Sequence, residues 1–187
     1  MNTSLSFEDV VRFHGHICPG VAIGYRMALA GLAALEEVRA EDEELVAIVE
    51  NDACGVDALQ YLSGCTFGKG NLIFHDYGKS TYTLFSRSTG QGVRITCRAN
   101  AIPKSIGDDR EARVDWILTA PEDVLLHVQI VTIDEPPKAR IHESLPCDEC
   151  GERVMSTRIQ ESGDRKLCIP CWEREQQVAA REVPGSP

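Results

Sequence analysis

The sequence predicts an α+β protein whose core runs helix, strand, helix and then three strands, with a small zinc ribbon behind it. Apolar residues recur at helical and strand spacings in that order over residues 19–99. Glycines and turn residues separate the strand-like runs. Two pairs of cysteines lie near the end of the chain. We therefore divide it into a core domain, residues 1–140, and a ribbon domain, residues 141–187.

The first part of the core carries helix signals. The stretch SFED has the form of a capping box, with Asp in place of the usual Glu or Gln, and predicts a short helix that ends near Phe13. Pro19 suits the first turn of a second helix, residues 19–37, which is nearly uncharged. We expect both faces of this helix to be covered. The next elements are a buried strand and a short helix, at residues 44–50 and 54–64.

The second part of the core is rich in strand signals. Three strand-like runs are separated by Gly78 and the stretch TGQG. An amphipathic helix ended by Pro121 follows, then one more strand, and DEPP marks a linker. We expect these elements at residues 72–77, 80–87, 92–99, 108–120 and 125–134.

Composition excludes several classes of protein. The net charge is −10, so the basic surface that nucleic acids require is absent. No apolar stretch is long enough to span a bilayer, and the first residues lack the pattern of a signal peptide. We expect a cytoplasmic protein that binds neither nucleic acid nor membrane. In that compartment eight cysteines favour metal or thiol chemistry over disulfides.

The most specific motif is the cysteine pattern of the tail. Cys147, Cys150, Cys168 and Cys171 follow the spacing C-x2-C-x17-C-x2-C, which is typical of zinc sites. Four thiolates leave no open position on the ion, so we expect a structural zinc. The competing interpretation is iron, either as a cluster or as a single rubredoxin-like ion. The segment has few apolar residues, and the metal must therefore supply much of its folding free energy.

The second motif is HGHICPG, residues 14–20. Cys18 directly precedes a predicted helix, whose N-terminus stabilises a thiolate. A thiolate beside imidazole is either a nucleophile with its base or part of a metal site. We expect His16, Cys18 and Cys54 to bind a divalent metal, zinc being one candidate, with the fourth position open. His14 and Asp57, beside Cys18, would then orient a ligand or move a proton, although the spacing leaves open which histidine binds the ion.

Other candidates around this motif have plainer alternatives. Cys65 and Lys69 lie in the loop GCTFGKGN, and we expect them near the bound ligand, with Lys69 facing an anionic group. The loop does not match a phosphate-binding P-loop, because Lys69 stands where the second glycine is required. The alternatives are a buried apolar cysteine and a solvated lysine. His75 has the inert histidine of a strand as its alternative, and HGHICPG that of a capped turn.

Three stretches together resemble the FmdE family, which is named for a component of formylmethanofuran dehydrogenase. They are FHGHICPG, DACGVDALQYLSGCTFGKGNL and DYGKSTYTL, and the resemblance covers about residues 5–135. It implies an α+β core with a mixed sheet, a homodimer, and a pocket with bound metal. The pocket residues implied are His14, His16, Cys18, Cys54, Asp57, Cys65 and Lys69. In methanogens the family is associated with a molybdenum or tungsten enzyme that fixes CO2 onto methanofuran.

Two functions follow from this resemblance and the motifs. The first is a redox enzyme or accessory subunit linked to formylmethanofuran dehydrogenase-type chemistry, with a small-molecule ligand at the core metal. The second is a non-catalytic module that binds metal or ligand and docks onto a partner protein through the ribbon. An open position on the core metal favours the first function, and a saturated metal favours the second.

Overall fold

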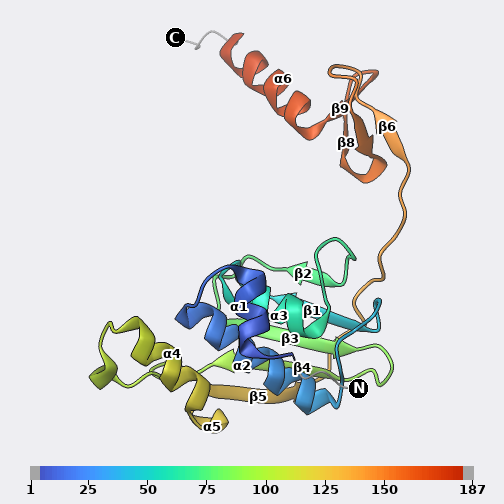
Figure 1. Cartoon of the computed structure of the whole chain (residues 1–187). Helices are drawn as coiled ribbons and strands as arrows, with labels where there is room; N and C mark the ends of the chain where they lie inside the picture. Colours follow the sequence, from blue (N-terminus) through green and yellow to red (C-terminus); the bar gives the residue numbers. More distant parts are fainter. Residues whose placement is uncertain (1–4, 183–187) are drawn as a thin grey trace. The chain divides into compact units, whose positions relative to one another are not determined.

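A computed structural model describes residues 5–182, and the chain divides into two compact units, Met1–Ala139 and Arg140–Pro187 (Figure 1). The first unit has the mixed α+β fold that the sequence predicts. Its elements are α1 (Phe7–His14), α2 (Pro19–Leu35), β1 (Leu45–Val49), α3 (Gly55–Ser63), β2 (Leu72–Phe74), β3 (Thr81–Ser86), β4 (Gly92–Cys97), a 3-10 turn (Lys104–Ile106), α4 (Arg110–Thr119), α5 (Glu122–Leu125) and β5 (Leu126–Val131).

The five strands form one sheet in the order β2-β1-β3-β4-β5. β1 and β2 are parallel, with Ile48 opposite Ile73, and every other pair is antiparallel. The sheet is therefore mixed. Helix α2 packs on β3, β4 and β5, α3 packs on β1, and α1 and α4 pack against α2.

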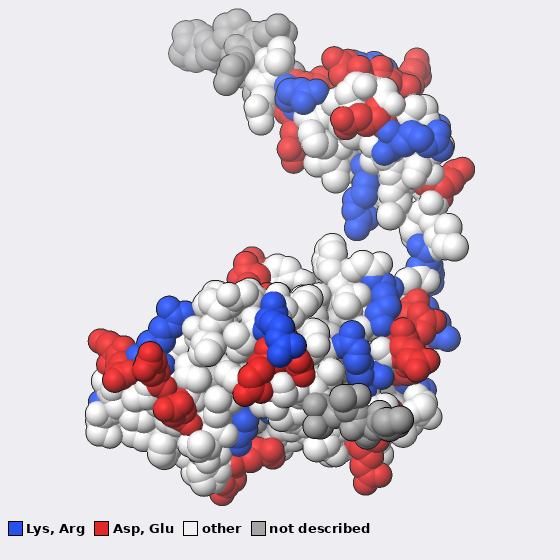
Figure 2. Space-filling view, viewed as in Figure 1, with Lys and Arg blue, Asp and Glu red and all other residues white. Residues whose placement is uncertain are grey.

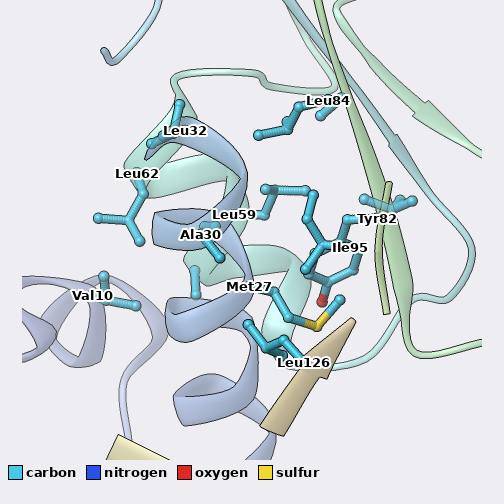
Figure 3. Packing of buried hydrophobic residues seen from close by; sticks show 14 of the residues in the cluster. Val10, Met27, Ala30, Leu32, Leu59, Leu62, Tyr82, Leu84, Ile95 and Leu126 are labelled. Atoms are coloured by element: carbon cyan, nitrogen blue, oxygen red, sulfur yellow. The ribbon is translucent and has the colours of Figure 1, made fainter. Parts of the chain in front are cut away.

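The core lies between α2, α3 and the sheet. Figure 3 shows Met27 and Leu59 of the helices among Leu84, Ile95 and Leu126 of the strands, and all five side chains are at most 1% exposed. The nearly uncharged helix that the sequence predicts is covered in this way by its own chain, so its composition does not require a second subunit.

Several elements are shorter than predicted, and each has a local cause. Helix α2 ends at Leu35 because Glu36 adopts a left-handed conformation with φ 55°. Strand β2 ends at Phe74, and residues 75–80 form an exposed loop. The predicted last strand begins with a short helix, α5, and β5 starts only at Leu126.

Residues 135–139, after β5, are fastened to the first unit. The Arg87 guanidinium donates to the Glu135 carboxylate and to the Pro136 carbonyl, both at 2.7 Å. The Ala139 amide donates to the Glu43 carboxylate at 3.0 Å. These contacts end where the second unit begins.

The second unit is two hairpins and a helix. Its elements are β6 (Ser144–Pro146), β7 (Arg153–Met155), a 3-10 turn (Ser156–Arg158), β8 (Ile159–Ser162), β9 (Arg165–Cys168) and α6 (Ile169–Glu182). β6 pairs with β7 and β8 pairs with β9. Its small buried cluster is made of Leu167 and three of the four cysteines.

No helix among residues 5–182 has both the length and the apolarity to cross a lipid bilayer. On the face drawn in Figure 2, acidic and basic side chains alternate, and no broad basic patch is present there.

The contact between α2 and α3 is made by backbone. A Cβ atom at Gly24 would lie 2.2 Å from the Gly55 carbonyl oxygen. We predict that Gly24→Ala destabilises the first unit by about 3 kcal/mol, because backbone cannot yield as a side chain does. Urea unfolding followed by circular dichroism measures this loss.

Gly68→Ala is the matched control, because nothing lies within 4 Å of a Cβ atom there. We expect it to change the free energy of unfolding by less than about 0.5 kcal/mol. Equal stabilities of the two variants would contradict the close contact.

Candidate metal centre

The HGHICPG loop joins α1 to α2, and each of its turns has a physical cause. Ser6 and Asp9 form a complete capping box at the start of α1. Gly15 ends that helix in a left-handed conformation with φ 98°, which glycine adopts without strain. Cys18 then caps α2, since its Sγ accepts a hydrogen bond of 3.4 Å from the Val21 amide. The thiol is thereby held at a helix start, as the sequence predicts.

The start of α3 supplies a second cysteine and a carboxylate. Cys54 directly precedes α3, and Asp57 lies in its first turn. The Asp57 carboxylate is 2.7 Å from Nδ1 of His14. This bond fixes the orientation of the imidazole and directs its other nitrogen, Nε2, away from Asp57.

Donor atoms of His14, His16, Cys18 and Cys54 lie within 4.8 Å of one another. The Nε2 atom of His14 is buried and has no hydrogen-bond partner among the described residues, although a buried nitrogen normally has one. Zinc binds imidazole at roughly 2.0–2.1 Å and thiolate at roughly 2.3 Å in tetrahedral sites, so two nitrogens and two sulfurs gathered this closely fit such an ion. The residues present therefore fit a metal.

The four donors are held with different firmness. Cys18 is buried, and the side chain of His14 is 9% exposed. Cys54 is partly buried. His16 is exposed and lies beside His14, with ring centroids 4.4 Å apart. Three donors are thus fixed by the fold, and the fourth faces solvent.

Burial, and secondly the neighbouring Cys18 thiol, raise the pKa of Cys54 above its ordinary value. Two thiols this close resist ionisation in the metal-free protein. A divalent cation reverses this preference, because it stabilises both thiolates at once.

Cys65 and Lys69, expected near the ligand, lie elsewhere. Cys65 follows α3, at the opposite end of this helix from Cys54. It is fully buried, and its thiol contacts the Leu45 carbonyl oxygen at 3.3 Å. Lys69 donates to the carbonyls of Glu41 and Asp42. Neither joins the donor cluster, and the structure gives them packing and loop-fastening contacts instead.

His75 is likewise separate from the donors. It stacks on Tyr77, with ring centroids 5.3 Å apart, in the exposed loop that follows β2. A residue near the donors that the sequence pattern did not indicate is Tyr82, which lies on β3 beside the start of α3. An aromatic residue inside a strand gives no signal beyond core packing.

The second unit gathers its four cysteines into one cluster, with the donor atoms within 4.8 Å of one another. Cys147 and Cys150 lie between β6 and β7, Cys168 ends β9, and Cys171 lies in the first turn of α6. Backbone N–H groups of Cys150 and Cys168 lower the pKa of Cys147 to about 6. The neighbouring thiol of Cys168 is the main cause that raises the pKa of Cys171 to about 12. Such a division is expected of four adjacent thiols that lack a cation.

A guanidinium that no sequence motif indicated lies next to this cluster. Arg174 donates to the Cys171 sulfur at 3.0 Å from one helical turn further along α6. Its charge stabilises the thiolate form and offsets part of the negative charge of a four-thiolate centre.

Comparisons with known proteins agree with both units. Residues 13–127 match the family described as FmdE, molybdenum formylmethanofuran dehydrogenase operon, and residues 140–177 match the prokaryotic dksA/traR C4-type zinc finger. A crystal structure of an FmdE-like protein of tungsten formylmethanofuran dehydrogenase, from Syntrophus aciditrophicus, is similar. Its TM-score is 0.68, with 26% identity over 90% of this chain and 93% of that one.

A curated relative from Archaeoglobus fulgidus is described as a probable S-adenosyl-L-methionine-binding protein. It is 31% identical over 200 residues, which cover 91% of this chain and 53% of that protein. The chain thus spans about half the length of this relative. The family match covers the core with its His/Cys donors, and the chain belongs to the FmdE family, with a C4-type zinc finger at its C-terminal side.

Proposed function

We propose that the first unit is a metal-dependent ligand-binding protein, in which a divalent ion held by His14, Cys18 and Cys54 binds a small molecule. The observation that carries this proposal is the unequal anchoring of the four donors. Three are fixed by helix starts and by Asp57, whereas His16 faces solvent. An exposed ligand can leave the ion without disturbing the fold, which gives a small molecule access to a coordination position.

The chemistry that the ion supplies is that of a Lewis acid or of an anion-binding centre. The residues of the chain do the rest. Asp57 holds His14 by its Nδ1 atom and, with 40% of its side chain exposed, connects the site to solvent, so that it can take up or release a proton there. The names of the family and of its solved member refer to molybdenum or tungsten formylmethanofuran dehydrogenase. On that basis we propose a role as an enzyme or accessory subunit of such redox chemistry.

A second function is favoured by the number of donors. Two histidines and two cysteines complete a tetrahedral shell without any ligand. A permanently closed centre would make the protein a non-catalytic module, with the zinc finger as its docking unit for a partner protein. The state of His16 distinguishes the two functions.

S-adenosyl-L-methionine is the first ligand to test, since the Archaeoglobus relative is named for it. Its amino and carboxylate groups are donors that a metal with one free position accepts. Calorimetric titration of the metal-loaded protein measures this binding. Heat released by the wild-type chain and lost in Cys54→Ser would place the ligand at the core ion.

We predict that Cys18→Ser and Cys54→Ser each remove one metal equivalent per chain and leave the zinc of the second unit in place. The reason is that each variant removes a buried or partly buried thiolate ligand. Elemental analysis of the purified full chain measures the metal content. Cys97→Ser, which changes a cysteine outside both clusters, is the control and should keep both metals.

The histidine variants separate the anchored donor from the exposed one. His14→Ala should lose the core metal, whereas His16→Ala should keep it with weaker affinity. Asp57→Asn should weaken metal binding by about 10- to 100-fold, the usual effect of a residue that orients a ligand. Full metal content in both cysteine variants would show that the ion is not bound here.

We also predict that removal of zinc unfolds the second unit and leaves the first folded. The second unit buries only a small cluster built mainly of its cysteines, so the metal supplies much of its folding free energy. Hydrogen exchange measured on the full chain with and without a strong chelator reports both units. Protection of β8 and β9 that survives chelation would contradict a structural zinc.

We propose, finally, that the first unit forms a homodimer. Phe67, Phe74 and Tyr77 are 76%, 43% and 61% exposed, and they lie on or beside β2, the edge strand of the sheet. Light scattering at micromolar concentration should give twice the chain mass, and Phe74→Lys should halve it. A wild-type monomer under these conditions would refute the dimer.

A further inference from the structure

A cavity of about 210 Å³ lies beside the donor cluster. Its walls come from the starts of α2 and α3, from the segment before α3, and from the loop that leads into β3. Gly20, Gly55 and Tyr82 are the lining residues nearest the donors. The cavity is large enough for a small organic molecule and too small for a large cofactor.

Gly20 forms the boundary between this cavity and the two thiols. A Cβ atom at this position would lie 3.8 Å from the Cys18 sulfur, 3.9 Å from the Cys54 sulfur and 3.2 Å from the Cys54 Cβ. The φ of Gly20 is not positive, so its backbone does not require glycine. What the glycine provides is space, because any side chain would stand between the cavity and both sulfurs.

Tyr82 provides a hydrogen-bond donor on the same wall. It projects from β3 into the layer between sheet and helices (Figure 3), and a Cβ atom at Gly55 would lie 2.5 Å from its hydroxyl oxygen. Burial, with the nearby Asp57 and Cys54 as lesser causes, raises the pKa of Tyr82 well above its ordinary value. The phenol therefore keeps its proton at physiological pH and donates.

The other polar groups of the cavity narrow the ligand chemistry. The amide nitrogen of Asn51 already donates to the Lys79 carbonyl, and its oxygen already accepts from the Ala53 amide. The hydroxyls of Ser80 and Tyr82 remain, together with the first residues of two helices, whose N–H groups and dipoles favour negative charge. A ligand that presents an acceptor oxygen suits this wall best.

We propose that this cavity is the subsite for the metal-bound ligand, that the ligand is a small carboxylate or carbonyl compound, and that Tyr82 donates a hydrogen bond to its oxygen. The proposal rests on the proposed metal centre of the core. It adds two positioning residues, since Tyr82 orients the ligand oxygen and Gly20 leaves the path to the ion open.

The test uses the full chain loaded with Co²⁺ and acetate as the probe. Acetate should change the visible absorption of cobalt in the wild type, because a carboxylate oxygen enters the coordination shell. Tyr82→Phe should keep its cobalt and bind acetate about tenfold more weakly, the usual loss for one hydrogen bond to a charged acceptor. Gly20→Ala should keep its cobalt and lose the spectral change, because its methyl group blocks access.

Matched controls locate the effect. Tyr25→Phe alters a tyrosine on α2 that packs on Phe7, and Gly68→Ala alters a glycine in open space, so both should titrate like the wild type. Cys54→Ser measures the contribution of cobalt in the second unit, which should not respond to acetate.

Each outcome is decisive. Unchanged acetate affinity in both Tyr82→Phe and Gly20→Ala would overturn the subsite and leave the metal centre standing. A wild-type chain that binds cobalt without responding to acetate would also overturn it, and would favour the closed, non-catalytic centre. A chain whose first unit binds no cobalt would overturn the proposed function itself.

Discussion

The rest of the first unit depends on the contact between the backbones of α2 and α3. Gly24 and Gly55 let the two helices approach until no side chain fits between them. This approach brings the residues before each helix, Cys18 and Cys54, into one cluster. It also places Asp57 where it reaches His14 at the end of α1. The metal centre is thus a consequence of helix packing, and its precision derives from the rigidity of the core.

The two units use cysteine in physically different ways. The first has a large apolar core of its own, so its donors sit on a scaffold that does not need the ion to fold. The second has only a small cluster built around its four thiols, so ion and fold depend on each other. A scaffold that is stable without metal tolerates an exchangeable ligand. A fold held by its metal does not, which agrees with a C4 set that has no open position.

The sequence predicts the order of helices and strands because apolar spacing and glycine punctuation are local signals. It also identifies HGHICPG and Cys54, since each directly precedes a helix. It misplaces Cys65, because closeness in sequence suggested closeness in space, whereas the nine residues of α3 separate the two cysteines by about 14 Å of helix. It could not find Tyr82, because which strand residue faces a helix start depends on register and on a glycine contact between distant segments.

The position of Asp57 decides how the two histidines differ. A histidine whose Nδ1 is held by a carboxylate has a fixed ring plane and a more basic Nε2, so it binds a metal strongly. A histidine without such a partner binds through a ring that rotates freely, and it loses more conformational entropy on binding. Competition for one coordination position is therefore settled at His16, the exposed residue, and a ligand that adds a hydrogen bond from Tyr82 gains an advantage there. The same four donors can close the centre or open it, and the balance depends on groups that touch no metal.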